Sequence, residues 1–543
     1  MSCRPLQAPL LALALLMLGT ALPARAQHAT EKSPGERLPV VKHVLPNGMT
    51  FLLLRREGAP TVSFVTQFRA GAVDEGTGVS GLAHLFEHML FKGTPTLGTR
   101  DYAAEQRIFP RVDAVADSFA AEFRKGEEAD TAVLARLRDR LKQLSDSARQ
   151  YVVSNELDRI LTENGAVRLN ASTFDDGTNY YFSLPANRAE LWFVLESDRI
   201  AHPVLREFYS ERDVVMEERR MRVETQPAGL LSEQFLEAAF VAHPYGRPVV
   251  GLPSTVQILT RPQAQEYFHR FYGPNNAVVA IVGDIDTTQM KQWADRYFAA
   301  IPPGEPHEPV AIQEPPQIGE RRIEVEYDAN PMVMMGYHVP DASHPDAPAL
   351  AVLSSILTGG RTSRLVQRLV VKNQIAASIN SGMMPGARYP RLFAFFGVPI
   401  APHTTREIEQ AVYDELDSLR ATPPTDYEME RVRNQTDAAS YGRLDNSFFI
   451  AYQLASSEAL WRDWAKTFRD DDAIRRVKAQ DVQRVVRKYF PQSSRTVATL
   501  VRPPQAAPPA PPPRPAPPAP NPPAPAQSPP ARPDSTQQAG GSR

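Results

Sequence analysis

The sequence contains almost no cysteine, since Cys3 is the only one among its 543 residues. Cys3 precedes the apolar run from Leu10 to Leu22 and the Ala-Arg-Ala at 24–26, a pattern typical of a secretory signal peptide cleaved before Gln27. The expected mature chain can therefore form no disulfide and offers no thiolate to a metal. We expect a protein exported to the periplasm of a Gram-negative bacterium, or secreted, whose stability comes from core burial.

The sequence also has little net charge and, after residue 26, no long hydrophobic run. Its formal charge of −2 at pH 7 provides no basic field for nucleic acid or anionic lipid. No later apolar run reaches the roughly 20 residues that a membrane-spanning helix needs. We therefore expect no nucleic-acid partner and no membrane span.

Proline is plentiful, with 51 residues, and it marks two segments in particular. Residues 302–316 form a Pro-rich stretch that is typical of a linker. The segment from Arg502 to Arg543 is rich in Pro and Ala, a composition that predicts disorder because it cannot bury enough surface to fold. The predicted parts are a signal peptide, an N-terminal domain, a linker, a C-terminal domain and a tail, at residues 1–26, 38–302, 303–319, 320–502 and 503–543.

One local pattern occurs twice in the chain. Residues 266–283 predict a helix, a Pro-containing turn and a buried strand, and residues 481–501 repeat that order. We interpret this as an internal duplication. It predicts an α+β fold of two homologous α/β sandwich halves, each a mixed sheet with helices packed on it.

The most informative motif is His-Leu-Phe-Glu-His at residues 84–88. It lies in a predicted helix that begins after Ser80 as N-cap, ends at Lys92-Gly93, and has an apolar stripe formed by Leu82, Leu85, Phe86, Met89 and Leu90. Residues three and four apart are neighbours on a helix, so His84, Glu87 and His88 lie together beside that stripe. Two imidazoles so placed can bind one Zn²⁺, with the carboxylate as a base. The alternative is a pair of ordinary surface histidines.

A third metal ligand must be His, Asp or Glu, because the mature chain has no thiol. The best candidates lie in the helical stretch 207–224, where Glu211, Val214, Val215 and Glu218 are predicted to share one face. A carboxylate beside valines is unusual unless something pairs with it. Glu217 is turned about 100° away toward charged residues and is the weaker candidate.

From Val41 to Val501 the chain resembles the pitrilysin family of inverted zinc metallopeptidases. The resemblance is carried by the segment around the His-Leu-Phe-Glu-His motif at 81–94, Leu-Asn-Ala-Ser-Thr at 169–173, Ser-Glu-Arg-Asp-Val-Val at 210–215 and His-Pro-Tyr-Gly at 243–246. It implies halves of the LuxS/metallohydrolase type and a zinc metalloendopeptidase acting on peptides or unfolded segments. Its natural substrate stays open.

The resemblance also implies a role for each matching residue of the site. His84, His88 and Glu218 would bind one zinc ion per chain. Glu87 would be the general base for hydrolysis by a polarised water, and Glu211 a supporting carboxylate in catalysis. Manganese and cobalt are alternative metals, because a site of this ligand type accepts several divalent ions.

Substrate binding is implied for Asn170 and Ala171. In the family the matching segment is an edge strand, to which an extended peptide adds by backbone pairing. The alternative for Asn170 is an ordinary turn residue. The aromatic run at 180–182 follows in a strand-like pattern and is predicted to belong to the core.

The predicted second half should bind no metal. In place of a motif helix it has residues 347–360, an apolar helix without His or Glu. Single-chain relatives also carry an Arg and a Tyr that help to hold the substrate, where this chain has Val370 and Ala377, which cannot donate hydrogen bonds from their side chains. In the two-subunit branch of the family a zinc-binding subunit pairs with a zinc-less homologue that supplies those side chains. The resemblance therefore implies a heterodimer with a homologous zinc-less subunit, with a homodimer as the alternative. A non-catalytic scaffold of the same fold is the alternative function.

Residues from Tyr102 to about Val153 lengthen the interval between the motif and the third-ligand helix. They predict an inserted helical hairpin with two apolar stripes, formed by Ala114, Val115, Phe119 and Phe123 and by Val133, Leu134, Leu137, Leu141 and Leu144. We interpret the hairpin as an arm that packs on itself. A gate or a partner dock is the alternative.

Overall fold

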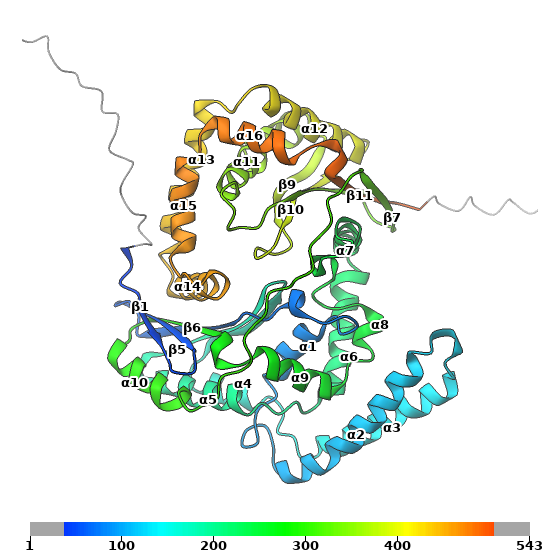
Figure 1. Ribbon diagram of the computed structural model, residues 1–543, viewed down its shortest axis with the longest axis vertical. Helices are drawn as coiled ribbons and strands as arrows, with labels where there is room; N and C mark the ends of the chain where they lie inside the picture. Colours follow the sequence, from blue (N-terminus) through cyan, green and yellow to red (C-terminus); the bar gives the residue numbers. More distant parts are fainter. Residues whose placement is uncertain (1–36, 504–543) are drawn as a thin grey trace, which may run out of the picture. The chain divides into compact units, whose positions relative to one another are not determined.

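The computed structural model describes residues 37–503, so the predicted signal peptide and nearly all of the predicted tail lie outside the described residues. The described residues up to Arg502 belong to one compact unit with two mixed β-sheets and the helices packed on them (Figure 1). Within residues 37–503, none of the helices combines the length and the apolar character that a membrane crossing requires.

The first sheet has six strands in the order β1-β2-β6-β3-β5-β4. Strands β2 and β6 pair in parallel, and the other neighbours are antiparallel. Strand β4 is an edge strand that pairs only with β5. The strands are β1 (Val41–Val44), β2 (Thr50–Arg55), β3 (Thr61–Phe68), β4 (Val167–Phe174), β5 (Gly177–Pro185) and β6 (Ala277–Gly283).

The second sheet repeats this topology with five strands in the order β7-β11-β8-β10-β9. Strands β7 and β11 pair in parallel, as β2 and β6 do, and the other neighbours are antiparallel. Leaving out β1, each strand has a counterpart at the same place in the other sheet, which confirms the predicted pair of homologous halves. The strands are β7 (Arg321–Glu326), β8 (Met332–Val339), β9 (Ala376–Met384), β10 (Arg391–Pro399) and β11 (Arg495–Val501).

One face of each sheet is covered by helices from the same half. Alternate strand residues such as Phe51, Phe64 and Ile281 pack against helices of the first half, and residues such as Met335 and Phe393 pack against helices of the second. These helices are α1 (Leu82–Met89), α5 (Ala189–Ala201), α6 (Phe208–Arg219), α9 (Arg261–Phe271) and α10 (Thr287–Phe298) in the first half, and α11 (Ala347–Thr358), α12 (Thr405–Ala421), α13 (Asp426–Arg443) and α16 (Ala479–Tyr489) in the second.

The opposite face of each sheet is covered by a helix from the other half. Helix α14 (Ser447–Trp461) packs Leu454 and its neighbours on the first sheet, against β3 and β6. Helix α7 (Pro227–Ala239) packs Phe235 and its neighbours on the second sheet, against β7, β8 and β11. The two helices are equivalent in the duplication. Helix α7 follows α6, helix α14 follows α13, and α6 and α13 are counterparts. The halves therefore share their cores and depend on each other for stability.

The predicted insertion is an antiparallel helical hairpin, α2 (Tyr102–Phe123) and α3 (Thr131–Arg149), which lie side by side (Figure 1). The predicted stripe on α3 is largely correct, with Leu141 and Leu144 buried. The stripe on α2 is turned from the prediction, because Ala114 is exposed while Val112 and Ala116 are buried. Three short helices and several single turns complete the described residues: α4 (Glu156–Glu163), α8 (Pro253–Val256), α15 (Lys466–Arg476), η2 (Ala72–Asp74), η3 (Gly126–Glu128), η4 (Ala186–Arg188), η5 (Arg220–Glu224), η6 (Pro244–Gly246), η7 (Pro274–Asn276), η8 (Val366–Lys372) and η9 (Gln492–Ser494).

Candidate metal centre

The motif helix α1 starts from a backbone turn at Gly81 rather than at the predicted cap Ser80. Gly81 has a φ of +90°, and a side chain there would lie 2.9 Å from the Cα atom of Gly251. The carboxylate of Glu75 accepts hydrogen bonds from the backbone N–H groups of Gly81 (3.0 Å) and Ala83 (2.8 Å), so it caps the helix in place of Ser80. Ser80 instead accepts a hydrogen bond from the N–H of Leu252.

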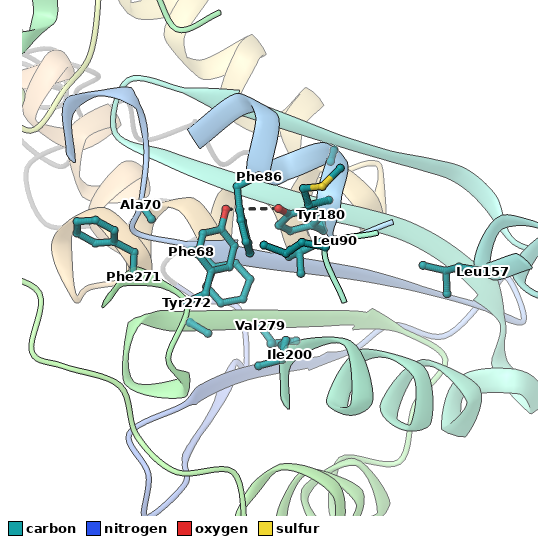
Figure 2. Packing of buried hydrophobic residues seen from close by; sticks show 14 of the residues in the cluster. Phe68, Ala70, Phe86, Leu90, Leu157, Tyr180, Ile200, Phe271, Tyr272 and Val279 are labelled. Atoms are coloured by element: carbon teal, nitrogen blue, oxygen red, sulfur yellow. Dashed lines mark hydrogen bonds between the residues drawn. The ribbon is translucent and has the colours of Figure 1, made fainter. Parts of the chain in front are cut away.

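The apolar face of α1 fixes the orientation of the helix. Phe86 is fully buried, and its ring centroid lies 4.4 Å from that of Tyr272, next to Tyr180 and Phe68 on the sheet (Figure 2). The hydroxyl groups of Tyr180 and Tyr272 form a hydrogen bond of 3.4 Å in this cluster. The predicted apolar stripe is thus buried, as expected, and the helix has little freedom to rotate about its axis.

Helix α6 supplies the two glutamates that the sequence pattern favours. Glu211 and Glu218 both approach the histidines of α1, while Glu217 forms an exposed ion pair with Arg220, as predicted. The predicted shared face is correct for Val215, which is fully buried, but wrong for Val214, which is 49% exposed. Helix α6 turns Val215 to the core and Val214 toward solvent.

The side chains of His84, His88 and Glu218 converge. Their ligand atoms all lie within 4.8 Å of one another. Nε2 of His84 is 3.6 Å from Oε1 of Glu218, and Nε2 of His88 is 3.6 Å from Oε2 of the same carboxylate. Ligands bound tetrahedrally at ~2.1 Å are about 3.4 Å apart, so these spacings fit one metal ion. Two imidazoles and a carboxylate without thiolate are the ligand set of hydrolytic zinc sites, which leave a fourth position to water.

The two histidines differ in electrostatics. Burial, together with the neighbouring His88 and Arg222, lowers the pKa of His84 to about 3, so its imidazole is neutral at pH 7. Burial also lowers the pKa of His88, but the hydrogen bond to Glu211 and the nearby carboxylates outweigh burial and leave this pKa raised. A bound metal would displace the proton of His88, because only the neutral imidazole is a ligand.

Glu211 supports His88 from behind. Its Oε2 lies 3.3 Å from Nδ1 of His88, while its other oxygen contacts Nζ of Lys92. Burial raises the pKa of Glu211, but its bonds to His88 and Lys92 outweigh burial and lower it, so the group is an anion at pH 7. A carboxylate at Nδ1 fixes the tautomer whose Nε2 faces the metal position. The structure thus places Glu211 on the histidine and not at the position of a reacting atom.

Glu87 lies beside the two histidines and is held by strand β4. The Oγ1 hydroxyl of Thr173 donates a hydrogen bond of 2.6 Å to Oε2 of Glu87. Burial raises the pKa of Glu87, with the Thr173 hydrogen bonds opposing the shift. Thr173 belongs to the sequence motif at 169–173, but the sequence alone predicted no role for it.

Arg222 is a second residue whose place at the site was not predicted from the sequence. Its guanidinium group lies 2.6 Å from Oε1 of Glu218, four residues earlier, although the side chain is largely exposed. The spacing of four residues on a helix was the available signal. Arg222 thus partly neutralises Glu218 on the side that faces His84.

The predicted substrate residues lie on the open edge of the first sheet. Asn170 and Ala171 pair with Tyr181 and Tyr180 of β5, and β4 has no neighbour on its other side within the described residues. Tyr180 is buried, as predicted for the aromatic run. The edge strand and the metal site are adjacent, because Thr173 of β4 bonds Glu87.

The counterpart of α1 in the second half carries no metal ligands. Helix α11 is apolar, and within residues 37–503 the cluster of His84, His88 and Glu218 is the only group of three or more His, Cys, Asp or Glu side chains that could hold a metal. Val370 lies in η8 and Ala377 in β9, at the start of the strand that corresponds to β4.

Two family models match parts of the chain. The model described as insulinase, peptidase family M16, matches residues 50–107, which include the motif helix. The model described as the peptidase M16 inactive domain matches residues 259–436, most of which belong to the metal-free half. Both models describe parts of one peptidase family.

Similar proteins and structures agree with these models. The zinc protease PqqE of Helicobacter pylori is 26% identical over 389 residues, which are 70% of this chain and 86% of that protein. The crystal structure of a protease from Helicobacter pylori is similar with a TM-score of 0.71 and 23% identity, over 86% of this chain and all of that one. The first half of the periplasmic protease PqqL from Escherichia coli is similar with a TM-score of 0.63 and 16% identity, over 87% of this chain and 93% of that one. From the two models we conclude that the chain carries segments of the M16 family of peptidases at residues 50–107 and 259–436.

Proposed function

We propose that this protein is a zinc-dependent endopeptidase that hydrolyses peptides or unfolded segments with Glu87 as general base. The observation that carries the proposal is the convergence of His84, His88 and Glu218 within 4.8 Å, with Glu87 on the same helix face. Relatives named zinc proteases support the same class of activity.

Each residue of the site has a distinct task in this proposal. His84, His88 and Glu218 hold the metal, and Glu211 orients His88 through Nδ1. A bound zinc ion supplies a Lewis acid that polarises the peptide carbonyl and lowers the pKa of water at the site toward ~7. Glu87 accepts the proton of the attacking water and returns it to the leaving amine. The Thr173 hydroxyl holds Oε2 of Glu87 during both transfers.

The open edge of β4 is the proposed substrate-binding surface. An extended peptide that pairs with the backbone near Asn170 and Ala171 lies beside the strand residue that contacts Glu87. Backbone pairing gives affinity without strict sequence preference, so we propose that the enzyme accepts extended segments of varied sequence.

We further propose that the active species is a heterodimer with a homologous zinc-less subunit, with a homodimer as the alternative. The full-length PqqL structure supports a paired arrangement, because this chain matches 48% of that chain and so corresponds to one of its halves. Val370 and Ala377 supply no hydrogen-bond donors of their own for a substrate. Full activity of the isolated chain as a monomer would contradict this proposal.

The proposed location is the periplasm or the exterior of the cell. The predicted signal peptide at residues 1–26 supports it, as does the similarity in fold to PqqL, which is a periplasmic protease of Escherichia coli. Fractionation of cells that express the full chain, with N-terminal sequencing of the product, tests both the location and cleavage before Gln27.

The decisive test compares wild type with Glu87→Gln for zinc content and peptide hydrolysis, alone and with a candidate partner. Stoichiometric zinc in both proteins and hydrolysis only in wild type would support the proposal. Zinc without hydrolysis under every pairing would favour the non-catalytic scaffold, the alternative suggested by the name of the model that matches residues 259–436.

A further inference from the structure

The turn of the β4–β5 hairpin is held by the metal-free half. Asp176 in this turn is 1% exposed. Its Oδ1 accepts a hydrogen bond of 2.6 Å from the hydroxyl of Tyr245, and its Oδ2 accepts bonds from the backbone N–H groups of Ala387 (2.5 Å) and Arg388 (3.2 Å). Ala387 and Arg388 lie in the loop between β9 and β10, residues 385–390. A first-half carboxylate is thus satisfied mainly by second-half backbone.

The approach of the two halves at this point leaves no spare room. A Cβ atom on Gly386 would lie 2.2 Å from the hydroxyl oxygen of Tyr245 and 2.7 Å from Oδ2 of Asp176. Real Cβ atoms do not make such contacts, so any side chain at this position would push the loop away from the turn. Tyr245 itself is fully buried and accepts a further hydrogen bond of 3.3 Å from the N–H of Tyr389.

A first route leads from this turn to Glu87 along strand β4. Thr173 pairs across the hairpin with Thr178, close to the turn, and their hydroxyl oxygens are 3.3 Å apart. The Thr173 hydroxyl donates to Oε2 of Glu87 at 2.6 Å. Since Asp176 fixes the end of the hairpin, it also limits the movement of Thr173 against Glu87.

A second route leads from the same loop to the start of α1. Arg388 forms an ion pair of 3.2 Å with Asp74, whose other oxygen lies 3.0 Å from Nε2 of His307, and all three side chains are at most 5% exposed. Glu75, which follows Asp74 in the chain, caps the first turn of α1 by accepting hydrogen bonds from Gly81 and Ala83. The segment before Asp74 also touches the hairpin, because the N–H of Val73 donates to the carbonyl of Asp175 at 2.9 Å.

We propose that the β9–β10 loop of the metal-free half positions the general base, acting through Asp176 and Thr173 on one side and through Asp74 and Glu75 on the other. Both routes end on α1, the first at Glu87 itself and the second at the N-terminus of its helix. This inference rests on the proposed function in taking Glu87 as the base. It gives the metal-free half a task in catalysis that requires no contact with the substrate. Asp176 and Arg388 are positioning residues in this scheme.

Gly386→Ala tests the proposal, with Gly382→Ala as the matched control. The control makes the same change on β9 of the same hairpin, where an added Cβ meets nothing within 4 Å. For Gly386→Ala we expect kcat to fall ~10- to 100-fold, with KM within ~2-fold and one zinc per chain retained. Amide exchange in residues 171–178 should become ~10-fold faster. The control should match wild type in every measurement.

Thr173→Ser and Thr173→Val provide an independent pair in case Gly386→Ala folds poorly. Serine keeps the hydroxyl and should retain kcat within ~3-fold, whereas valine should lose ~10-fold or more at unchanged zinc content. Unchanged kcat in Thr173→Val, or unchanged exchange at 171–178 in folded Gly386→Ala, would overturn the proposal. The exchange measurement needs no hydrolysis, so a wild type that hydrolyses no peptide alone or with any partner would refute the proposed function, while amide exchange would still decide the coupling between the halves.

Discussion

The two halves of this protein share one strand order, but among the described residues only the first carries the proposed metal site. Helix α1 follows β3 and helix α11 follows the equivalent strand β8, yet α1 presents His84, Glu87 and His88, and α11 is apolar. The second half contributes a helix to the other core and a loop to the turn beside Glu87. The comparison teaches that a few side chains on two helices of the first half, α1 and α6, determine the site, while both halves contribute to holding it.

The largest effect should follow from removing a metal ligand in the first half. His84→Ala leaves two of three ligands, so we expect loss of zinc and of all hydrolysis above background. Ser355→Ala on α11 should change neither. Metal analysis and a peptide assay on both variants check this contrast. Persistent hydrolysis by zinc-free His84→Ala would contradict the proposal that the first half binds the metal needed for activity.

The next largest effect should come from helices α7 and α14, each of which packs on the sheet of the other half. Phe235 of α7 is fully buried on the second sheet, and Leu454 of α14 is fully buried on the first. Replacing either by Ala should destabilise the whole compact unit, by about 3–5 kcal/mol for Phe235 and about 2–5 kcal/mol for Leu454. Urea unfolding should keep a single transition in both variants. Two separate transitions, only one of them shifted, would show that the halves are independent.

A smaller effect should come from the inserted hairpin, which has no counterpart in the second half. Glu105 of α2 and Arg206 form an ion pair with side chains at most 1% exposed, so Glu105→Gln leaves a buried charge without its partner. Such changes cost about 3–5 kcal/mol, partly offset here by three backbone carbonyls that accept from Arg206. The melting temperature of Glu105→Gln, compared with that of the exposed control Glu127→Gln, measures this loss of stability. Equal melting temperatures would mean that the hairpin is not anchored by this pair.

The smallest effect concerns acid stability of the second half. Burial raises the pKa of Glu428, but Arg364 and the cap residue Thr425 outweigh burial and lower it from 4.5 to about 2. Because the folded-state pKa is the lower one, Glu428 stabilises the protein above pH 4.5, and this contribution is lost as the pH falls from 4.5 to 2. Glu428→Gln should therefore lose less stability than wild type between pH 6 and 3. Exposed Glu430→Gln on the same helix should behave as wild type does.

Much of the fold and the site was predictable from the sequence because local periodicity determines them. The motif helix, its buried stripe, the duplication and the approach of Glu211 and Glu218 follow from spacing, whereas the choice of Glu218 as the ligand came from the family resemblance. The helix cap was not predictable, because Glu75 reaches Ala83 from outside the helix and no local rule selects it over Ser80. The face of α2 was predicted about one residue out and that of α6 was wrong only at Val214, since consecutive apolar residues allow more than one stripe.

The exchange of α7 and α14 lay beyond sequence reasoning for a different reason. Each helix is visibly apolar, with Leu231 and Phe235 on one and Ile450 and Leu454 on the other. An apolar face does not say which of two similar sheets it will cover. The same holds for Asp176, whose partners in the β9–β10 loop are about 210 residues away.

The most direct test of the account is the zinc content of Glu218→Gln beside Glu211→Gln, measured after chelation and reconstitution with one equivalent of zinc. Glu218 faces both Nε2 atoms, and Glu211 only supports Nδ1 of His88. The account predicts one zinc per chain in wild type, near zero in Glu218→Gln, and retained zinc with ~10- to 100-fold weaker affinity in Glu211→Gln. Stoichiometric zinc in Glu218→Gln, or its loss only in Glu211→Gln, would contradict the proposed metal centre.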